Sequence, residues 1–117
     1  MGATRNFELS NSFETTNNTA QRVFSYTCTV DGVYFIKLNV KAFNVTDGTA
    51  YIQDSYRGFK RVAGTVTTLA ATANSYAFGD ATITVLISFT GDELYIELTG
   101  VTAKTIDWNS KSELELT

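Results

Sequence analysis

Residues 82–99, TITVLISFTGDELYIELT, constrain the fold more than any other part of the chain. Apolar and polar residues alternate on both sides of a turn at residues 90–93, which is the pattern of two β-strands with one buried face. Gly91 can adopt the positive φ angle that a tight hairpin turn requires. The predicted buried face consists of Ile83, Val85, Ile87, Phe89, Leu94, Ile96 and Leu98. Two strands cannot bury such a face alone, so a second sheet must cover it.

The rest of the chain also has strand-length alternating segments, separated by the turn signals Asp31 with Gly32, Asp47 with Gly48, and Gly64. The predicted strands lie at residues 20–30, 33–43, 49–62 and 65–73, with a loop at 74–80. Residues 104–108 and 111–117 are expected to supply a final strand. Turn signals at this spacing favour an all-β antiparallel sandwich or barrel, which we assign to a domain at residues 19–117.

The segment at residues 1–18 is polar and is expected to form an N-terminal arm. Phe7, Leu9 and Phe13 are its main large apolar residues after Met1, and a single short strand is predicted around residues 7–10. Polar terminal segments are poorly ordered unless something holds them. A partner subunit is therefore expected to hold this arm.

Composition excludes several classes of protein. The net charge of −3 and the scattered basic residues argue against nucleic-acid binding, since only Arg57, Lys60 and Arg61 lie close together. No apolar stretch is long enough to span a membrane, and the polar start predicts no secretory signal peptide. The single Cys28 cannot form an intrachain disulfide and is expected to be a buried thiol.

The absence of histidine removes the usual general base and most transition-metal sites. Two carboxylates on facing strands would suffice for glycoside hydrolysis, but most of the acidic candidates fall at turns or on outward faces. Those candidates are Asp54, Asp92, Glu93, Glu97 and Asp107. Asp47 and Asp80 do not lie in an EF-hand pattern. We therefore expect no enzyme, no metal site and no cofactor.

Aromatic residues supply the remaining site candidates. Tyr51, Tyr56, Phe59 and Tyr76 are expected either to stack on sugar rings or to lie in a subunit interface. The chain has eight Phe, six Tyr and one Trp, more large apolar groups than one small core hides comfortably. This surplus favours self-association, with a trimer as the expected form.

Three stretches of the C-terminal half occur in a distinctive order. RGFKRVAGTVTTLA at 57–70 is followed by the hairpin at 82–100, which closes on a TG dipeptide, and then by KTIDW at 104–108 with an acidic, aliphatic end. This order resembles a module of tailed-bacteriophage virion proteins, found in capsid decoration proteins and in tail-fibre or tail-spike domains. KTIDW is the most specific part of the resemblance.

The resemblance implies a jelly-roll-like sandwich that assembles as a homotrimer on the virion surface and carries no catalytic residues. A chain that begins at Met1 and holds little else favours a stand-alone decoration protein, which would bind the major capsid protein and stabilise the capsid. Phe7, Leu9 and Phe13 are then the expected capsid contacts. The alternative is a receptor-binding module of a tail fibre or tail spike that binds carbohydrate.

Overall fold

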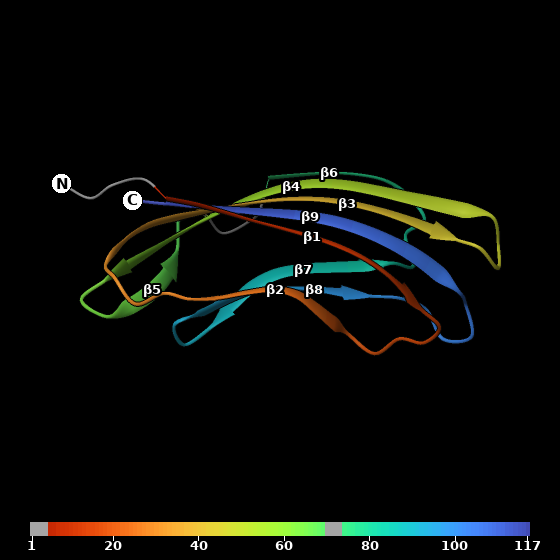
Figure 1. The fold of residues 1–117 in the computed structure, drawn as a ribbon, viewed down its shortest axis with the longest axis horizontal. Coiled ribbons are helices and arrows are strands. Elements are labelled where there is room, and N and C mark those ends of the chain that lie inside the picture. Colours follow the sequence, from red (N-terminus) through yellow and green to blue (C-terminus); the bar gives the residue numbers. More distant parts are fainter. Residues whose placement is uncertain (1–4, 70–73) are drawn as a thin grey trace.

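The computed structural model describes residues 5–69 and 74–117. Strands account for 73% of the described residues, which contain no helix. Two antiparallel sheets pack face to face, so the predicted all-β sandwich is confirmed (Figure 1). The expectations for residues 1–4 and for the end of the predicted strand 65–73 lie outside the described residues, which include no part of 70–73.

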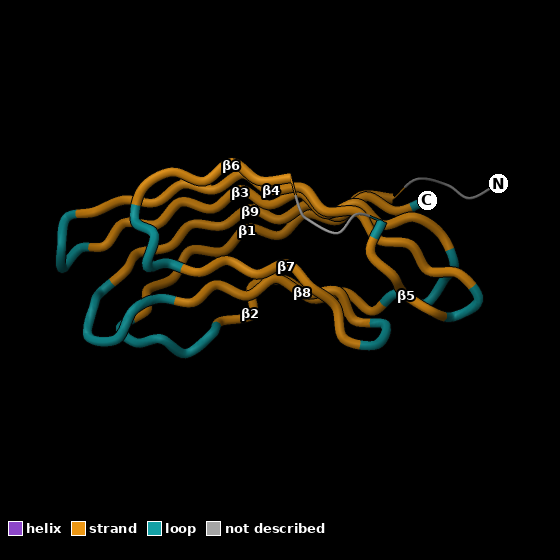
Figure 2. The backbone as a smooth tube through the Cα atoms, turned by 180° about the vertical axis from the view of Figure 1, so that it is seen from behind, coloured by secondary structure: helices purple, strands orange, loops and turns teal. Residues whose placement is uncertain are grey.

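The strands, in chain order, are β1 Arg5–Thr15, β2 Gln21–Thr27, β3 Gly32–Asn44, β4 Thr49–Val62, β5 Thr65–Thr68, β6 Asn74–Gly79, β7 Thr84–Thr90, β8 Glu93–Thr99 and β9 Ile106–Leu116. The large sheet has the order β1-β9-β3-β4, with β5 and β6 both pairing with β4; the small sheet has the order β2-β8-β7 (Figure 2). The first strand pairs with the last and the second with the last but one, a nested pairing like that of a rolled-up ribbon.

The hairpin of β7 and β8 forms as predicted. Gly91 has a φ of 58°, the positive value that the first central residue of a type II′ turn adopts. The predicted core face points inward. Ile83, Ile87, Leu94, Ile96 and Leu98 are buried, and Val85 and Phe89 are partly buried against the core.

The large sheet covers this face mainly with β3. Its even-numbered residues Tyr34, Ile36, Leu38, Val40 and Ala42 are all buried. Cys28 is a buried free thiol, as predicted, and burial raises its pKa to about 11. A thiol with such a pKa stays protonated at neutral pH, so Cys28 acts as a small apolar group of the core.

The N-terminal segment differs from the expected arm. β1 runs over 11 residues, much longer than the short strand predicted around residues 7–10, and pairs along its whole length with β9 of the same chain. Its inward side joins the core, since Phe13 stacks on Trp108 and Thr15 accepts a hydrogen bond from the Trp108 indole at 2.9 Å. Polar composition concealed this strand because β1 is an edge strand with one solvated face.

The predicted loop at residues 74–80 is wrong for most of its length. Residues 74–79 form β6, which pairs with β4 from Tyr51 to Tyr56. Gly79 allows this strand to end close to β4, because a side chain there would collide with the carbonyl oxygen of Ala50. Asn, Ser and Gly indicated a loop locally, but backbone pairing with a long neighbouring strand overrode that preference.

The turn between β4 and β5 carries a non-glycine residue with positive φ. Ala63 and Gly64 have φ angles of 52° and 80°, as the two central residues of a type I′ turn require. The Asp31 carboxylate accepts hydrogen bonds from both backbone N–H groups, at 2.8 and 3.2 Å. These bonds lower the pKa of Asp31. Asp31 therefore ties the β2–β3 loop to this turn.

We expect Ala63→Asn to stabilise the fold by about 0.5 to 1 kcal/mol, because asparagine tolerates the left-handed region better than alanine. Thermal unfolding followed by circular dichroism should show Tm higher by a few degrees. Ala20→Asn is the control, because Ala20 is exposed and has no positive φ. A lower Tm for Ala63→Asn would contradict this account of the turn.

Candidate functional site

The large sheet has a face turned away from the small sheet, which we call the outer face (Figure 2). Residues directly opposite each other on antiparallel strands share a face, so the pairing register assigns side chains to it. One row across the strands consists of Ser12, Asn109, Lys41, Ile52 and Phe78, and the next consists of Ser10, Lys111, Asn39, Asp54 and Tyr76.

Large apolar side chains gather on the β3–β4–β6 half of the outer face. Phe43, Ile52, Tyr76 and Phe78 are 48%, 46%, 66% and 65% exposed, and Ile52 lies directly opposite Phe78. We call these four residues the apolar strip. A mainly apolar hollow of about 360 Å³ lies beside Phe43, Ala50 and Ile52. Contiguous exposed apolar surface of this kind marks a site of contact with another molecule.

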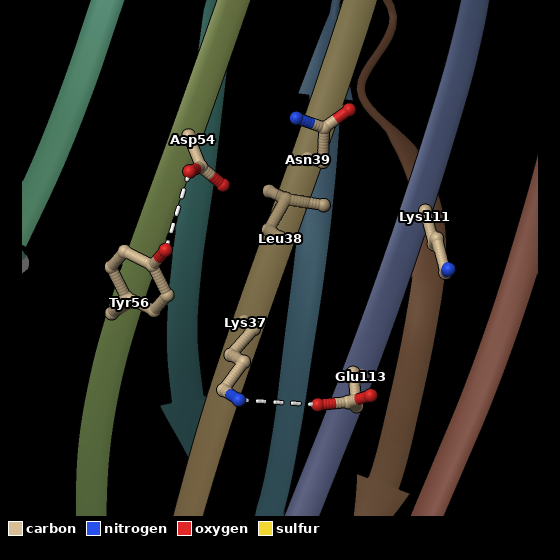
Figure 3. A pocket seen from close by; sticks show the side chains of 7 residues that line it. All are labelled: Lys37, Leu38, Asn39, Asp54, Tyr56, Lys111 and Glu113. Atoms are coloured by element: carbon tan, nitrogen blue, oxygen red, sulfur yellow. Dashed lines mark hydrogen bonds and ion pairs between the residues drawn. The ribbon is translucent and has the colours of Figure 1, made fainter.

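A smaller, polar hollow of about 160 Å³ lies next to the strip (Figure 3). It is lined by Lys37, Leu38, Asn39, Asp54, Tyr56, Lys111 and Glu113. The Tyr56 hydroxyl donates to the Asp54 carboxylate at 3.3 Å, and the Tyr56 ring stacks on Phe35 with centroids 6.0 Å apart. Tyr56 is thus held in place by one polar and one aromatic neighbour.

The charges around the polar hollow are only partly paired. Lys37 contacts Glu115 at 3.3 Å and Glu113 at 3.4 Å, and its pKa is raised chiefly by the hydrogen bond to Glu115. Asn39 and Lys111 have no side-chain hydrogen bond or ion pair within residues 5–69 and 74–117. The hollow therefore offers an amide and an ammonium group to a ligand.

The four aromatic candidates divide between the two sides of the large sheet. Tyr51 and Phe59 are buried in the core, so the expectation that they stack on sugars or lie in an interface is wrong. Tyr56 and Tyr76 lie on the outer face. Both are near Asp54, since Tyr56 is two residues further along β4 and Tyr76 lies directly opposite Asp54 on β6. Successive residues of a strand point to opposite faces of the sheet. Tyr51 and Phe59 have odd numbers and Tyr56 an even number, so alternation along β4 accounts for the difference.

The three apolar residues of β1 lie on its inward side. Phe13 packs on Trp108, and the Phe7 ring lies 5.4 Å from that of Tyr26. Phe7 and Leu9 nevertheless remain 40% and 45% exposed, because β1 lies at the open edge of the sandwich. Phe13 is partly buried, so Phe7 and Leu9 are the more accessible of the three at that edge.

The small sheet presents a different kind of outward face. Arg22 contacts Glu93 at 2.7 Å and Glu97 at 3.1 Å, and its guanidinium group lies 4.1 Å from the centre of the Tyr95 ring. The three charges named here are thus paired within the chain, with Arg22 shared by the two glutamates. The outer face of the large sheet is therefore the better candidate for an interaction surface.

The acidic candidates do not assemble into a catalytic or metal-binding group. Asp54 and Asp107 share the outer face but lie on strands separated by β3 and opposite different residues of it. Asp47 is paired with Lys104 at 2.8 Å. In the part of the chain that the structure describes, no three His, Cys, Asp or Glu residues are close enough to hold a metal ion.

Sequence reasoning overlooked Asn39, Lys111 and three members of the apolar strip, Phe43, Ile52 and Phe78. All but Phe78 occupy the expected polar positions of alternating strands, so alternation alone assigned them to solvent. Their proximity depends on the pairing of β9 with β3 and of β6 with β4, and these partners are separated in sequence by other strands. Apolar residues at expected polar positions, Phe43 above all, were the sequence signal for this surface.

Comparison with models of known protein families and with curated proteins found no match to this chain. Among the described residues, no helix has the length and apolar character needed to cross a bilayer.

Asp80 should make the free energy of unfolding depend on pH in the acid range. Its carboxylate accepts hydrogen bonds from the Thr82 backbone and hydroxyl and from the Thr49 hydroxyl, which lower its pKa to about 2. A folded-state pKa below the unfolded value means that this stabilisation is complete above about pH 4 and is lost as pH falls through about 2.

We therefore expect Asp80→Asn to lower the urea midpoint at pH 7 and to differ less from the natural chain as pH approaches 2. Thr82→Val, which removes one donor to the same carboxylate, should change stability in the same direction. A difference that stays constant across this pH range would show that Asp80 does not act through its ionised form.

Proposed function

We propose that this chain is a structural protein of a bacteriophage particle, which binds the outer capsid surface as a homotrimer and stabilises the capsid. The observation that carries the proposal is the apolar strip of Phe43, Ile52, Tyr76 and Phe78, exposed together on one face of a rigid sandwich. Such a face suits a protein that works by contact. The other outward face carries the ion-paired group Arg22, Glu93 and Glu97, with Leu86 as an exposed large apolar residue.

The sequence resemblance supplies the identity of the partner. The stretch from Lys104 to Trp108, together with the hairpin at 82–100, is similar to a module of capsid decoration proteins. In this proposal the outer face lies between subunits of the trimer and the β1 edge contacts the major capsid protein. The protein is then located on the virion surface and needs neither cofactor, nucleic acid nor membrane.

The β1 edge supports this division of roles. β1 pairs only with β9 within the described residues, so one of its edges has free backbone donors and acceptors. A free edge can extend a sheet of another protein, with side chains adding specificity. Phe7 and Leu9 are half-exposed at this edge, where they could be covered by a capsid subunit.

A non-enzymatic role agrees with the arrangement of side chains. The chain has no histidine, and its buried thiol is held in the protonated form by burial. A decoration protein acts by adding contacts between capsid subunits. Its effect should therefore appear as resistance of the particle to heat or osmotic shock.

We expect Leu9→Arg to weaken binding to capsids by about tenfold or more, because the contact would bury an unpaired charge. Deleting residues 1–18 is a poorer test, since it would uncover Trp108. Co-sedimentation with undecorated particles of the encoding phage measures binding, and Leu86→Arg, on the outward face of the small sheet, is the matched control.

Particles without the protein should also lose their contents at lower temperature than decorated ones. Electron microscopy of the particle should show density spread over the capsid. Density confined to the tail tip would contradict the capsid assignment and favour attachment to the tail.

A second candidate function, carbohydrate binding on a tail fibre or tail spike, is favoured by the polar hollow. Tyr56 offers a ring face there, and Asn39, Asp54 and Lys111 offer groups that can hydrogen-bond to hydroxyls. Aromatic and polar side chains combined in a hollow are suited to a small polar ligand. This function competes with assembly for the same face.

If the outer face serves assembly, a glycan array probed with the purified chain should show no binding that depends on Tyr56. Tyr56→Ala and Tyr95→Ala form a matched pair, because Tyr95 lies on the outward face of the small sheet. Binding that survives Tyr95→Ala and disappears with Tyr56→Ala would rank carbohydrate recognition above capsid decoration.

A further inference from the structure

The outer face has two halves of opposite charge. The β1–β9 half presents the acidic residues Glu8, Glu14, Asp107, Glu113 and Glu115, with Lys111 as its one lysine. The β3–β4–β6 half presents the apolar strip together with Lys37, Lys41 and Lys60, and Asp54 is its one acid. The charge difference between the halves follows from which strands lie side by side.

The acidic half contains like charges in direct opposition. Glu8 lies opposite Glu113, and Glu14 lies opposite Asp107. Like charges at directly opposed positions of an antiparallel pair destabilise the sheet. Glu113 shares Lys37 with Glu115, whereas Glu8, Glu14 and Asp107 have no ion-pair partner among the described residues.

The other half holds lysines that are also unpaired. Lys41 and Lys60 are exposed on the outer face and form no ion pair within residues 5–69 and 74–117. Lys41 lies one row away from the Glu14 and Asp107 pair, at a similar height along the strands. The unpaired acids of one half and the unpaired Lys41 of the other therefore lie at similar positions along the strands.

We propose that the outer face is the contact between copies of this chain, with the acidic β1–β9 half of each subunit against the basic, apolar β3–β4–β6 half of the next. This inference rests on the proposed homotrimer and names its interface. Within one chain the two halves meet along β9 and β3, where Lys37 pairs with Glu113 and Glu115. Glu8, Glu14, Asp107, Lys41 and Lys60 form no ion pair among the described residues, so a second copy is needed to pair them.

In a trimer whose axis is parallel to the strands, the unpaired charges of both halves find partners on neighbouring subunits. Their outer faces form the inner walls of a three-sided prism, in which each acidic half meets a neighbouring basic half and the ring closes. Residues at similar heights then meet, which brings Glu14 and Asp107 of one subunit near Lys41 of the next. The apolar strip is covered, and the charge pairs specify the neighbour.

The test is a charge swap. The natural chain should have three times its monomer mass of 12.8 kDa by size exclusion with light scattering, and high salt should weaken the assembly. Lys41→Glu and Glu14→Lys should each raise the dissociation constant about tenfold or more. The double variant, which exchanges the two charges, should regain the trimer.

Gln21→Glu is the control, because it adds a negative charge to an exposed position of the small sheet and should leave the mass unchanged. Circular dichroism confirms that each variant is folded, and the salt titration of the natural chain tests the interface without any substitution. A monomeric or dimeric natural chain, single variants that remain trimeric, or a double variant that stays dissociated would overturn the proposal.

These outcomes are separable from those of the capsid experiment. A charge-swapped trimer that forms but does not bind capsids would contradict the proposed function and leave the interface standing. A monomer that binds capsids would contradict the interface and the homotrimer and leave capsid binding standing.

Discussion

The packing of β3 against β8 is the contact on which the rest of the structure depends. Even-numbered residues of β3 and the apolar residues Leu94, Ile96 and Leu98 of β8 are almost fully buried. Each such side chain contributes about 1.5 to 3 kcal/mol by leaving water. β3 is also paired on both sides, by β9 and β4, so the same strand that anchors the core holds the centre of the large sheet in place.

The outer face follows from that packing. Once the even residues of β3 point inward, its odd residues Lys37, Asn39, Lys41 and Phe43 must point outward. Pairing with β9 and β4 then sets acidic residues on one side of this row and apolar residues on the other. The chemistry of the face is thus a consequence of strand register, and each half is exposed because no part of the described chain covers it.

The two outward faces of the sandwich have different means of satisfying their charges. On the small sheet, Arg22 of β2 forms ion pairs with both Glu93 and Glu97 of β8. On the large sheet, like charges oppose each other and lysines remain unpaired. This contrast favours a protein that functions by association through one broad face, with the β1 edge available to a second partner.

Alternation within each strand, and Gly91 at the turn, were enough to determine the class of fold and the core face of the β7–β8 hairpin. The same alternation distinguishes Tyr51 and Phe59 from Tyr56, although the prediction grouped all these aromatic residues together. The length of β1, the existence of β6 and the grouping of Lys41 with Glu14 and Asp107 were decided only by tertiary structure. Edge strands form through backbone hydrogen bonds to a partner that is distant in sequence, and local composition does not specify that partner.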